Sequence, residues 1–343
     1  MQAVNLRKIL ITGAGGYIGT KLVSKLLHNG FEIIALDTFW FGCHLENHKN
    51  LVIVKADLRS VDLPKLFVGI DAVVHLASIS NDPSYELNPV FSESINVTAS
   101  IRLIEHCRKS NIKRFIFASS SSVYGVRKEH DVTEKLMPEP ITIYSKSKIT
   151  IENYLKTHGS KDFDIVILRP ATVYGVSPRL RLDVVCNLLS AQAYYDKLIT
   201  VHGGEQLRPQ IHIDKMTDVY LACLNEIKYF SGEIFNVSEE NYSVKQIAEQ
   251  IKSLSDHIVD INFLPVFDTR SYKINSNKFL NYFKLNLFSN LENGITELIH
   301  YFKKNPNIVW TDEIYHNVKK LKNIQTEKNE LSRDFLCGSK FLK

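Results

Sequence analysis

The most chemically suggestive spacing in this sequence is a tyrosine followed four positions later by a lysine, at Tyr144 and Lys148. On a helix, residues four apart lie on one face, about one turn from each other. A phenol has an ordinary pKa of about 10, and a nearby ammonium group lowers that pKa because it stabilises the phenolate. Tyr144 is therefore a candidate general base for a hydroxyl group, with Lys148 as its partner. Taken alone, the same spacing also fits a solvated helix surface.

Four consecutive serines at 119–122 follow the apolar run 115–118, which predicts hydroxyl groups at the end of a β-strand. In a parallel sheet, ligands bind in the crevice beyond the carboxyl ends of the strands. A serine there can hydrogen-bond the reacting oxygen of a substrate. The serines and the tyrosine form a candidate catalytic site if the fold brings them together.

Three glycines spaced three residues apart, Gly13, Gly16 and Gly19, lie in the segment TGAGGYIG directly after the apolar run 8–12. This arrangement is typical of a phosphate-binding turn between a strand and a helix. The first glycine allows the sharp turn, the second lets backbone N–H groups approach a pyrophosphate, and the third lets the helix pack closely on the sheet. The positive end of the helix dipole adds to the attraction for an anion.

Acidic residues end the next two expected strands. Asp37 lies 18 residues after Gly19, where a carboxylate can accept both ribose hydroxyls of an adenosine and would repel a 2′-phosphate. Asp57 closes the third expected strand with Leu58 beside it, at a position suited to the adenine edge, although an aspartate there is also a common turn former. The glycine turn and Asp37 together predict a dinucleotide site that prefers NAD to NADP.

Short apolar runs alternate with longer helical patterns through the first half of the chain, which is typical of a parallel sheet covered by helices on both faces. We therefore predict an α/β fold, with a doubly wound parallel (Rossmann) sheet and a smaller, discontinuous C-terminal substrate lobe. The expected strands are 8–12, 31–37, 51–56, 71–76, 114–118 and 165–169, and the expected helices of this half are 17–28, 89–109 and 144–157.

Beyond residue 172 the alternation loosens, but the segment 233–237 looks like a further strand that returns to the sheet. Helical patterns follow at 183–195 and 243–254, and we expect the polar tail to form a surface helix or a partly ordered extension. The expected parts are an NAD-binding domain at 1–172 with a return segment at about 210–240, a substrate-binding lobe at 173–209 and 241–311, and a tail at 312–343.

The composition is that of an ordinary globular protein. Of the 343 residues, 44% are hydrophobic and 23% are charged, which supplies a sizeable core and excludes a disordered or collagen-like chain. The 42 basic and 37 acidic residues leave a formal charge of +5 without a dense basic stripe before the tail. Nucleic acid is therefore not an expected partner.

Targeting and metal-binding signals are weak. The apolar run at 9–11 is too short for a signal peptide and no run of 18 apolar residues occurs elsewhere, so we expect neither secretion nor a membrane partner. The five cysteines are odd in number and lack C-x-x-C spacing, which suits a reducing cytoplasm. The 12 histidines form no H-E-x-x-H motif and no Cys/His cluster, so no metal site is predicted.

Together these motifs resemble the extended short-chain dehydrogenase/reductases, and within them the NAD-dependent epimerase/dehydratase group that acts on nucleotide sugars. The resemblance runs from about residue 8 to residue 279. It is carried by TGAGGYIG at 12–19, HLAS at 75–78, SSSSVYG at 119–125, YSKSK at 144–148, LRPATVYG at 168–175, RPQIHIDKMTD at 208–218 and FNVS at 235–238, together with Asp37, Asp57, Leu58 and Asn96.

The resemblance implies roles for individual residues. Ser120, four positions before the tyrosine of V-Y-G, matches the family's catalytic Ser/Thr, and Tyr144 and Lys148 match its base and the partner of that base. The residues expected to contact NAD are Gly13, Gly16, Tyr17, Ile18, Asp37, Asp57, Leu58, Leu76, Ala77, Ser78, Asn96, Tyr144 and Lys148. The residues expected to contact substrate are Ser120, Tyr144, Thr172, Arg179, Arg208 and Arg270.

Four of these substrate contacts rest on different grounds. Arg208 and Arg270 resemble arginines that grip the substrate diphosphate, for which the planar guanidinium is well suited. Arg179 follows Pro178 in the substrate-side loop 172–181 and meets either sugar or phosphate, or solvent. Many family members carry asparagine where this chain has Thr172.

The implied chemistry is NAD-dependent oxidation at C4 of a nucleotide-diphosphate sugar, which gives a 4-keto sugar. We expect 4-epimerisation, in which hydride returns to the opposite face; a 4-keto-sugar reductase or a C4 dehydrogenase are the alternatives. We rank 4,6-dehydration low, because Ser121 and Ser122 stand where related dehydratases place an acid.

The rival from another class is a non-catalytic, NAD-sensing scaffold of the same fold, against which the presence of Ser120, Tyr144 and Lys148 argues. The family also implies a homodimer, in which the helices at 89–109 and 144–157 form a four-helix bundle with those of a second copy.

Overall fold

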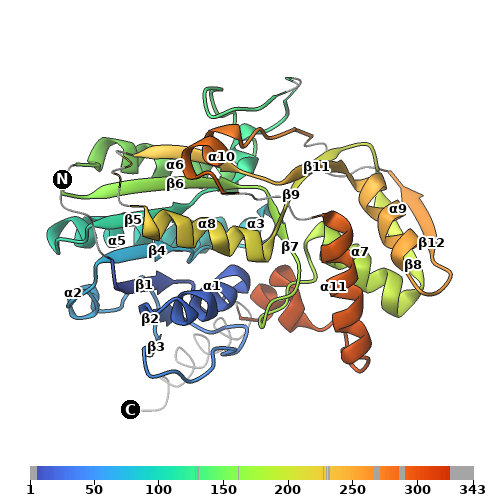
Figure 1. Cartoon of the computed structure of the whole chain (residues 1–343), viewed down its shortest axis with the longest axis horizontal. Helices are drawn as coiled ribbons and strands as arrows, with labels where there is room; N and C mark the ends of the chain where they lie inside the picture. Colours follow the sequence, from blue (N-terminus) through green and yellow to red (C-terminus); the bar gives the residue numbers. More distant parts are fainter. Residues whose placement is uncertain are drawn as a thin grey trace, which may run out of the picture.

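Seven strands form one parallel sheet in the computed structural model of the chain (Figure 1). The structure describes residues 6–127, 129, 131–160, 162–226, 228, 230, 232–265, 271–285 and 290–324. In sheet order the strands are β10 (Glu233–Val237), β6 (Asp164–Pro170), β5 (Arg114–Ala118), β4 (Ala72–His75), β1 (Lys8–Thr12), β2 (Glu32–Asp37) and β3 (Leu51–Lys55). The six expected strands and the returning strand are thus confirmed, with ends that differ by at most one residue.

The strand order reverses between β1 and β4, because the chain first builds the sheet outward through β2 and β3 and then continues on the other side of β1. Ligands bind at such a switch point in open α/β sheets. The predicted fold class, a doubly wound parallel sheet, is confirmed.

Helices cover both faces of the sheet. One face packs against α1 (Tyr17–His28) and α8 (Ile213–Asn225), and the other against α5 (Ala99–Lys109) and α6 (Ile143–His158). Successive residues of a strand point to opposite faces, so both faces of these strands must be apolar. The buried core on each side explains why the inner strands are continuous apolar runs in the sequence.

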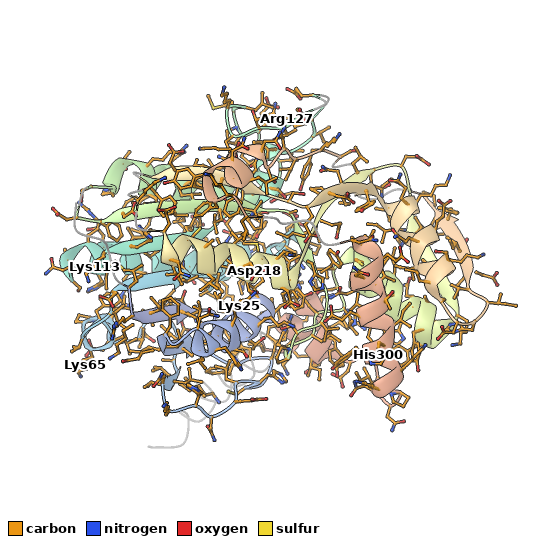
Figure 2. The ribbon with its side chains drawn as sticks, viewed as in Figure 1. Lys25, Lys65, Lys113, Arg127, Asp218 and His300 are labelled. Carbon is orange, nitrogen blue, oxygen red and sulfur yellow. The ribbon has the colours of Figure 1, made fainter. Side chains whose placement is uncertain are left out.

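The helices α1 and α8 lie side by side on their face of the sheet (Figure 2). Lys25 on α1 forms an ion pair with Asp218 on α8 and also donates to the Thr217 hydroxyl, 3.2 Å away. Figure 2 labels Lys25 and Asp218 where the two helices meet. This contact ties the glycine-turn helix to the helix that precedes the returning strand β10.

The single helix expected at 89–109 is interrupted. It consists of α4 (Pro89–Glu93), a π-helical turn at Ser94–Thr98, and α5. The Asn88 side chain accepts a hydrogen bond from the Phe91 N–H and so caps the first of these pieces. The π turn contains Asn96, whose side chain faces the loop after β4 and not the solvent. Such turns often occur near functional sites.

A second lobe packs beside the sheet and has its own apolar core, which includes Leu189, Ile247 and Leu298 (Figure 1). Three separate stretches of the chain build it. The segment from β9 (Leu207–His212) to β10 separates the first stretch from the second, and α10 (Asn277–Phe283), which packs on β10, separates the second from the third. The elements of this second lobe are α7 (Val185–Ala191), the π-helical turn Gln192–Asp196, β8 (Leu198–His202), α9 (Val244–Leu254), β12 (Asp260–Leu264) and α11 (Leu291–Lys304).

A three-stranded sheet, in the order β11, β9 and β7, connects the second lobe to the seven-stranded sheet. No helix among the described residues is long and apolar enough to cross a bilayer. The remaining elements are β7 (Thr172–Tyr174), β9 (Leu207–His212), β11 (Glu240–Ser243), α2 (Leu63–Leu66), α3 (Asp82–Glu86), α10 (Asn277–Phe283) and the 3-10 turns Ser121–Tyr124 and Glu313–Tyr315.

The C-terminal tail differs from the expectation of a surface element. Residues 317–324 form a helix, but Asn317, Leu321 and Ile324 on it are buried. Polar side chains dominate the tail sequence, yet these three recur at the spacing of one helix face, and that face packs on the rest of the protein. Residues 325–343 lie outside the described part of the chain.

Candidate active site

A cavity of about 470 Å³ lies at the carboxyl ends of the sheet strands, where the sheet meets the second lobe. Its position matches the switch point between β1 and β4. Most of the predicted site residues line it: Gly13, Gly16, Tyr17, Ile18, Asp37, Asp57, Leu58, Leu76, Ala77, Ser78, Ser120, Tyr144, Lys148, Thr172, Arg179 and Arg208.

The glycine turn is shaped for close approach. Gly13 has φ +76°, and a Cβ there would come within 2.6 Å of the Ala77 backbone nitrogen. At Gly19 a Cβ would come within 2.2 Å of the Gly13 carbonyl oxygen. Gly16 precedes α1, and no side chain caps that helix, so the positive end of its dipole is left for an anion. The turn can therefore receive a pyrophosphate group.

Asp37 is held rigidly at the end of β2. Its carboxylate accepts hydrogen bonds from the Gly15 N–H at 2.9 Å and the Phe39 N–H at 2.7 Å. Burial raises the pKa of this carboxyl above its ordinary value, and the backbone donors oppose that effect. A fixed acceptor at this strand end suits the hydroxyl groups of a ribose.

Asp57 lines the cavity but is already engaged. Arg59 donates to both of its carboxylate oxygens, the shortest contact being 2.6 Å, and the same guanidinium lies over the Phe91 ring. The neighbouring Leu58 is buried and presents an apolar wall. This part of the cavity therefore presents an apolar wall and an ion-paired carboxylate to a ligand, and not an unpaired charge.

The three predicted catalytic residues meet in the cavity. Tyr144 and Lys148 lie on α6, whose start is fixed by a capping box between Thr142 and Ser145. The Lys148 ammonium lies 5.6 Å from the centre of the Tyr144 ring and donates to the Ala118 carbonyl at 2.8 Å. Ser120 follows β5 as the N-cap of a 3-10 turn, and its hydroxyl lies 2.9 Å from the Ser122 hydroxyl.

Burial shifts the pKa values of Tyr144 and Lys148 away from their ordinary values. Burial, together with the nearby Asp82 carboxylate, raises the pKa of Tyr144 to about 12, although Arg181 and Ser120 oppose the rise. Burial also lowers the pKa of Lys148 to about 7, against the attraction of Glu152. Without a bound ligand, the phenol is protonated at neutral pH. A cationic group beside the ring is needed to lower the pKa of the phenol toward neutral pH, so that it can act as a base.

One predicted residue, Asn96, is described by the structure but does not line the cavity. Asn96 accepts from the Ile79 N–H at 2.8 Å and donates to the Ile79 carbonyl at 3.0 Å. Its side chain therefore fixes the loop after β4 without lining the cavity. Arg270 lies outside the described residues.

Several cavity residues were not predicted from the sequence as site residues. Asp82 and Arg181 both act on the Tyr144 phenol, and Asp183 pairs with Arg181 at 2.7 Å. Asn317 and Leu321 come from the tail and line the same cavity. Arg181 was visible, with Arg179, as a charge in a substrate-side loop, but nothing in the sequence placed Arg181 close enough to Tyr144 to affect its pKa.

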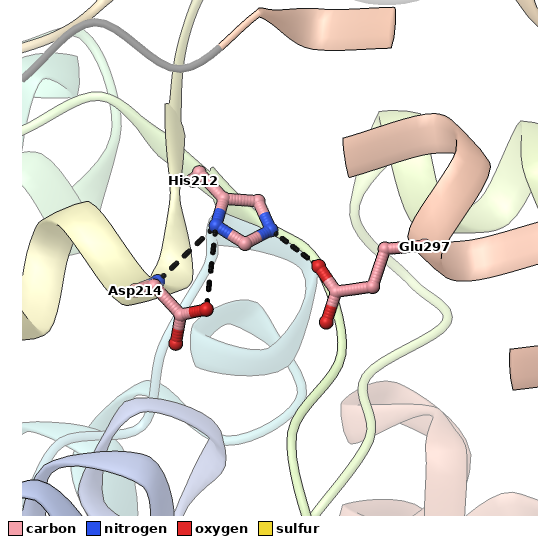
Figure 3. Close-up of side chains that lie close together, drawn as sticks. All are labelled: His212, Asp214 and Glu297. Carbon is pink, nitrogen blue, oxygen red and sulfur yellow. Dashed lines mark hydrogen bonds and ion pairs between the residues drawn. The ribbon is translucent and has the colours of Figure 1, made fainter. Parts of the chain in front are cut away.

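A second cluster of polar residues lies between β9 and α11 (Figure 3). Among the described residues, His212, Asp214 and Glu297 are close enough to hold a metal ion. However, His212 Nδ1 accepts from the Asp214 N–H at 3.4 Å, so the neutral ring carries its proton on Nε2 and donates it to Glu297 at 2.8 Å. Both ring nitrogens thus have protein partners, and the contact fastens α11 to the start of α8.

Residues 9–238 match the family model of the NAD dependent epimerase/dehydratase family, which is well over half of the chain. The chain belongs to the NAD-dependent epimerase/dehydratase family. A relative from Bacillus subtilis, an uncharacterized UDP-glucose epimerase, is 35% identical over 271 residues, which cover 75% of this chain and 84% of the relative.

Solved structures of family members share the fold. The UDP-glucuronic acid 4-epimerase from Bacillus cereus, in complex with UDP-glucuronic acid and NAD, is 29% identical, with a TM-score of 0.80 over 87% of this chain and 99% of that one. The UDP-N-acetylglucosamine 4-epimerase from Methanobrevibacter ruminantium, in complex with UDP-N-acetylmuramic acid, is 25% identical, with a TM-score of 0.81 over 88% of this chain and 99% of that one.

This family member is an enzyme whose cofactor is NAD, and its own residues fit that cofactor. The Gly13 and Gly19 positions have no room for a side chain, which leaves the backbone open to a pyrophosphate. Asp37 stands ready for the adenosine ribose, and Lys148 lies beside Tyr144 where the nicotinamide ribose is expected. The predicted preference for NAD rests on these residues.

Because burial lowers the pKa of Lys148, we expect the free energy of unfolding of this protein without NAD to depend on pH. Between pH 7 and 10.5 the unfolded chain binds a proton on this lysine that the folded chain does not, so the free energy of unfolding rises with pH in that window, by up to about 1.4 kcal/mol per pH unit. Lys148→Met removes this contribution. Urea unfolding of both proteins at several pH values should show the stability advantage of the variant shrinking as pH rises; parallel pH curves would contradict the burial of an uncharged lysine.

Proposed function

We propose that this enzyme is a nucleotide-sugar 4-epimerase that oxidises C4 transiently and keeps NAD through the reaction. The observation that carries the proposal is the meeting of Ser120, Tyr144 and Lys148 in the cavity that also contains the glycine turn and Asp37. The relatives support the same class of reaction, since the Bacillus cereus enzyme is named as a 4-epimerase and the Bacillus subtilis protein as an epimerase.

Each of the three residues has a distinct task in the proposed reaction. NAD, when bound, accepts a hydride and later returns it. The Tyr144 phenolate takes the proton of the C4 hydroxyl, and the Ser120 hydroxyl hydrogen-bonds the same oxygen. The Lys148 ammonium stabilises the phenolate. In the reverse half-reaction Tyr144 gives the proton back to the oxygen of the 4-keto sugar, so atoms and charges balance over the cycle.

The residues around Ser120 favour epimerisation over dehydration. Loss of water across C5 and C6 needs a further acid or base, and Ser122 stands where related dehydratases carry it. Ser122 instead donates its backbone N–H to the Ser120 oxygen at 3.2 Å and so orients that hydroxyl. Asp82 supplies a carboxyl group elsewhere in the cavity, from α3. The product of the reaction therefore has to be identified directly.

We propose a UDP-sugar as the substrate, because the named relatives are UDP-sugar enzymes. Arg208 would contact its diphosphate, and Thr172 and Arg179 line the same cavity. Arg270 is proposed as a second diphosphate ligand on the basis of the sequence alone. A homodimer through α5 and α6 is also proposed, since Ile101 and Tyr154 keep partly exposed apolar surface on those helices.

A panel of UDP-, GDP-, CDP- and dTDP-sugars, incubated with the purified protein with and without added NAD, tests the proposal. We expect the C4 epimer of a UDP-sugar, with no net change in NADH absorbance. Stoichiometric consumption of NAD or NADH would instead indicate a dehydrogenase or a reductase. A product lighter by one water would indicate a dehydratase. No turnover of any sugar, with NAD bound, would favour the scaffold hypothesis.

A further inference from the structure

The helix at 317–324 forms part of the active-site wall. Asn317 and Leu321 line the cavity and are only 7% and 3% exposed. The segment before the helix is fastened to the second lobe, because the Tyr315 carbonyl accepts a hydrogen bond from the Leu182 N–H at 2.9 Å. In Figure 1 this helix is drawn in red between the labels of α1 and α11.

Asn317 links the two sides of the cavity. Its side-chain oxygen accepts from the Arg179 guanidinium at 2.6 Å, and its side-chain nitrogen donates to the Ser80 hydroxyl at 2.9 Å. Its backbone N–H donates to the Asp183 carboxylate at 3.1 Å. Ser80 follows β4 of the large sheet, whereas Arg179 and Asp183 precede α7 of the second lobe. One residue of the tail thus bonds to both walls.

The contact with Arg179 fixes a buried charge near the cofactor side of the cavity. The Arg179 guanidinium lies over the Phe41 ring, 3.9 Å from its centre, and Phe41 follows Asp37 by four residues. The arginine is 3% exposed, and burial, together with the nearby Arg181, lowers its pKa to about 9. Asn317 supplies an acceptor for this poorly solvated guanidinium and thereby holds it in place.

The apolar face of the same helix packs toward the catalytic tyrosine. Leu321 and Ile324 form a buried cluster with Ile79 and Tyr85. The side chains of Trp40 and Tyr144 pack against that cluster. Ile79 follows the cofactor-lining loop after β4, and Trp40 follows β2. The helix therefore covers the edge of the cavity along which the dinucleotide site extends from Asp37 to Tyr144.

We propose that residues 317–324 are the outer wall of the NAD site, retain the dinucleotide between turnovers and position Arg179. The inference rests on the proposed function, because an epimerase that recycles its hydride internally gains from keeping NAD. Release of NAD then requires the contacts of Asn317 and Leu321 to open. Their loss should act mainly on the rate of NAD release, since most changes in affinity appear in dissociation.

The test compares Asn317→Ala and Leu321→Ala with Asn323→Ala, an exposed asparagine on the same helix whose side chain bonds to Glu313. The protein is loaded with radiolabelled NAD and freed of excess by gel filtration, and the release of the label is followed after dilution into unlabelled NAD. We expect release to become about tenfold faster or more in the first two variants, because each removes buried contacts, and to be unchanged in the control.

Additional variants distinguish the loss of contacts made by residues 317–324 from a general loss of folding. Asn317→Asp keeps an acceptor for Arg179 but loses the donor to Ser80, so its release rate should fall between those of the wild type and Asn317→Ala. Leu321→Val carries the test of the apolar contact if Leu321→Ala does not fold. Wild-type release rates in folded Asn317→Ala and Leu321→Val would overturn the proposal. NAD release is measured without any sugar, so the two proposals can fail separately. Faster release in the variants of a protein that epimerises no sugar would reject the proposed function and support the proposal that residues 317–324 retain NAD.

Discussion

Replacement of Tyr144 by phenylalanine is expected to lower kcat by about 10²- to 10⁴-fold, the range associated with loss of a general acid–base. The phenylalanine ring fills the same space, so the packing of Tyr144 against the cluster of Ile79 and Tyr85 is kept. In the proposed reaction, what is lost is the group that carries the C4 proton in both halves of the cycle. Epimer formation from a UDP-sugar, measured at saturating substrate, gives the change in kcat.

The matched control for this prediction is Tyr154→Phe on the same helix. The Tyr154 hydroxyl donates to Glu105 at 2.5 Å, away from the cavity, so its removal should leave kcat within a few-fold of the wild type. NAD binding and circular dichroism should be unaffected in both variants. Retention of near-wild-type turnover by Tyr144→Phe would remove the tyrosine from the reaction and, with it, the proposed chemistry.

The inner strands of the sheet were predictable because they are buried on both faces, whereas the edge strand β3 is an apolar run that stays partly exposed. Ile9 and Ile11 pack on one side of β1 and Leu10 on the other, which forces a continuous apolar run that is easy to recognise. The same rule located the serine run 119–122 and Asp37, since polar residues directly after such runs lie at the carboxyl edge of the sheet, and the family resemblance then singled out Ser120. These parts of the site depend on local sequence and on one rule of topology.

The tail contacts were not predictable in the same way. Asn317 bonds to Ser80, from which it is separated by 237 residues, and nothing local in either segment indicates that contact. The recurrence of Asn317, Leu321 and Ile324 on one helix face was the available signal for burial. It could indicate that the helix packs somewhere, but not that it packs on the active site.

Asn96 shows a different limit. The family resemblance assigned it to the cofactor, and its position near the loop after β4 is consistent with that region. The oxygen and nitrogen of its side chain, however, form hydrogen bonds with the backbone of Ile79. Sequence matching identifies a position that a family keeps near its site, whereas the hydrogen bonds of each side chain depend on the packed structure.

Glu152 is a buried acid one helical turn after Lys148 and belongs to the support of the catalytic site. It accepts from the Arg169 guanidinium at 2.9 and 2.6 Å and from the Ser119 hydroxyl at 2.5 Å. Neither Glu152 nor Arg169 has appreciable exposed side-chain surface. Glu152 also favours the charged form of Lys148, because it partly offsets the effect of burial on the pKa of that lysine. One carboxylate thus connects β6, the serine run and α6.

Replacement of Glu152 by alanine is expected to lower the free energy of unfolding by about 3–5 kcal/mol, because removal of one member of a buried ion pair leaves the other charge without compensation. Urea unfolding at pH 8 measures this loss, and Glu152→Gln, which keeps hydrogen-bonding atoms without the charge, should give a smaller one. Glu139→Ala is the surface control, since that acid pairs with Arg127 while its own side chain is 65% exposed. The pKa of Lys148 should fall further in Glu152→Ala, so its catalytic activity should fall even under conditions in which the variant is fully folded. A stability equal to that of the surface control would show that Arg169 finds other partners and that Glu152 is not the charge that holds this network together.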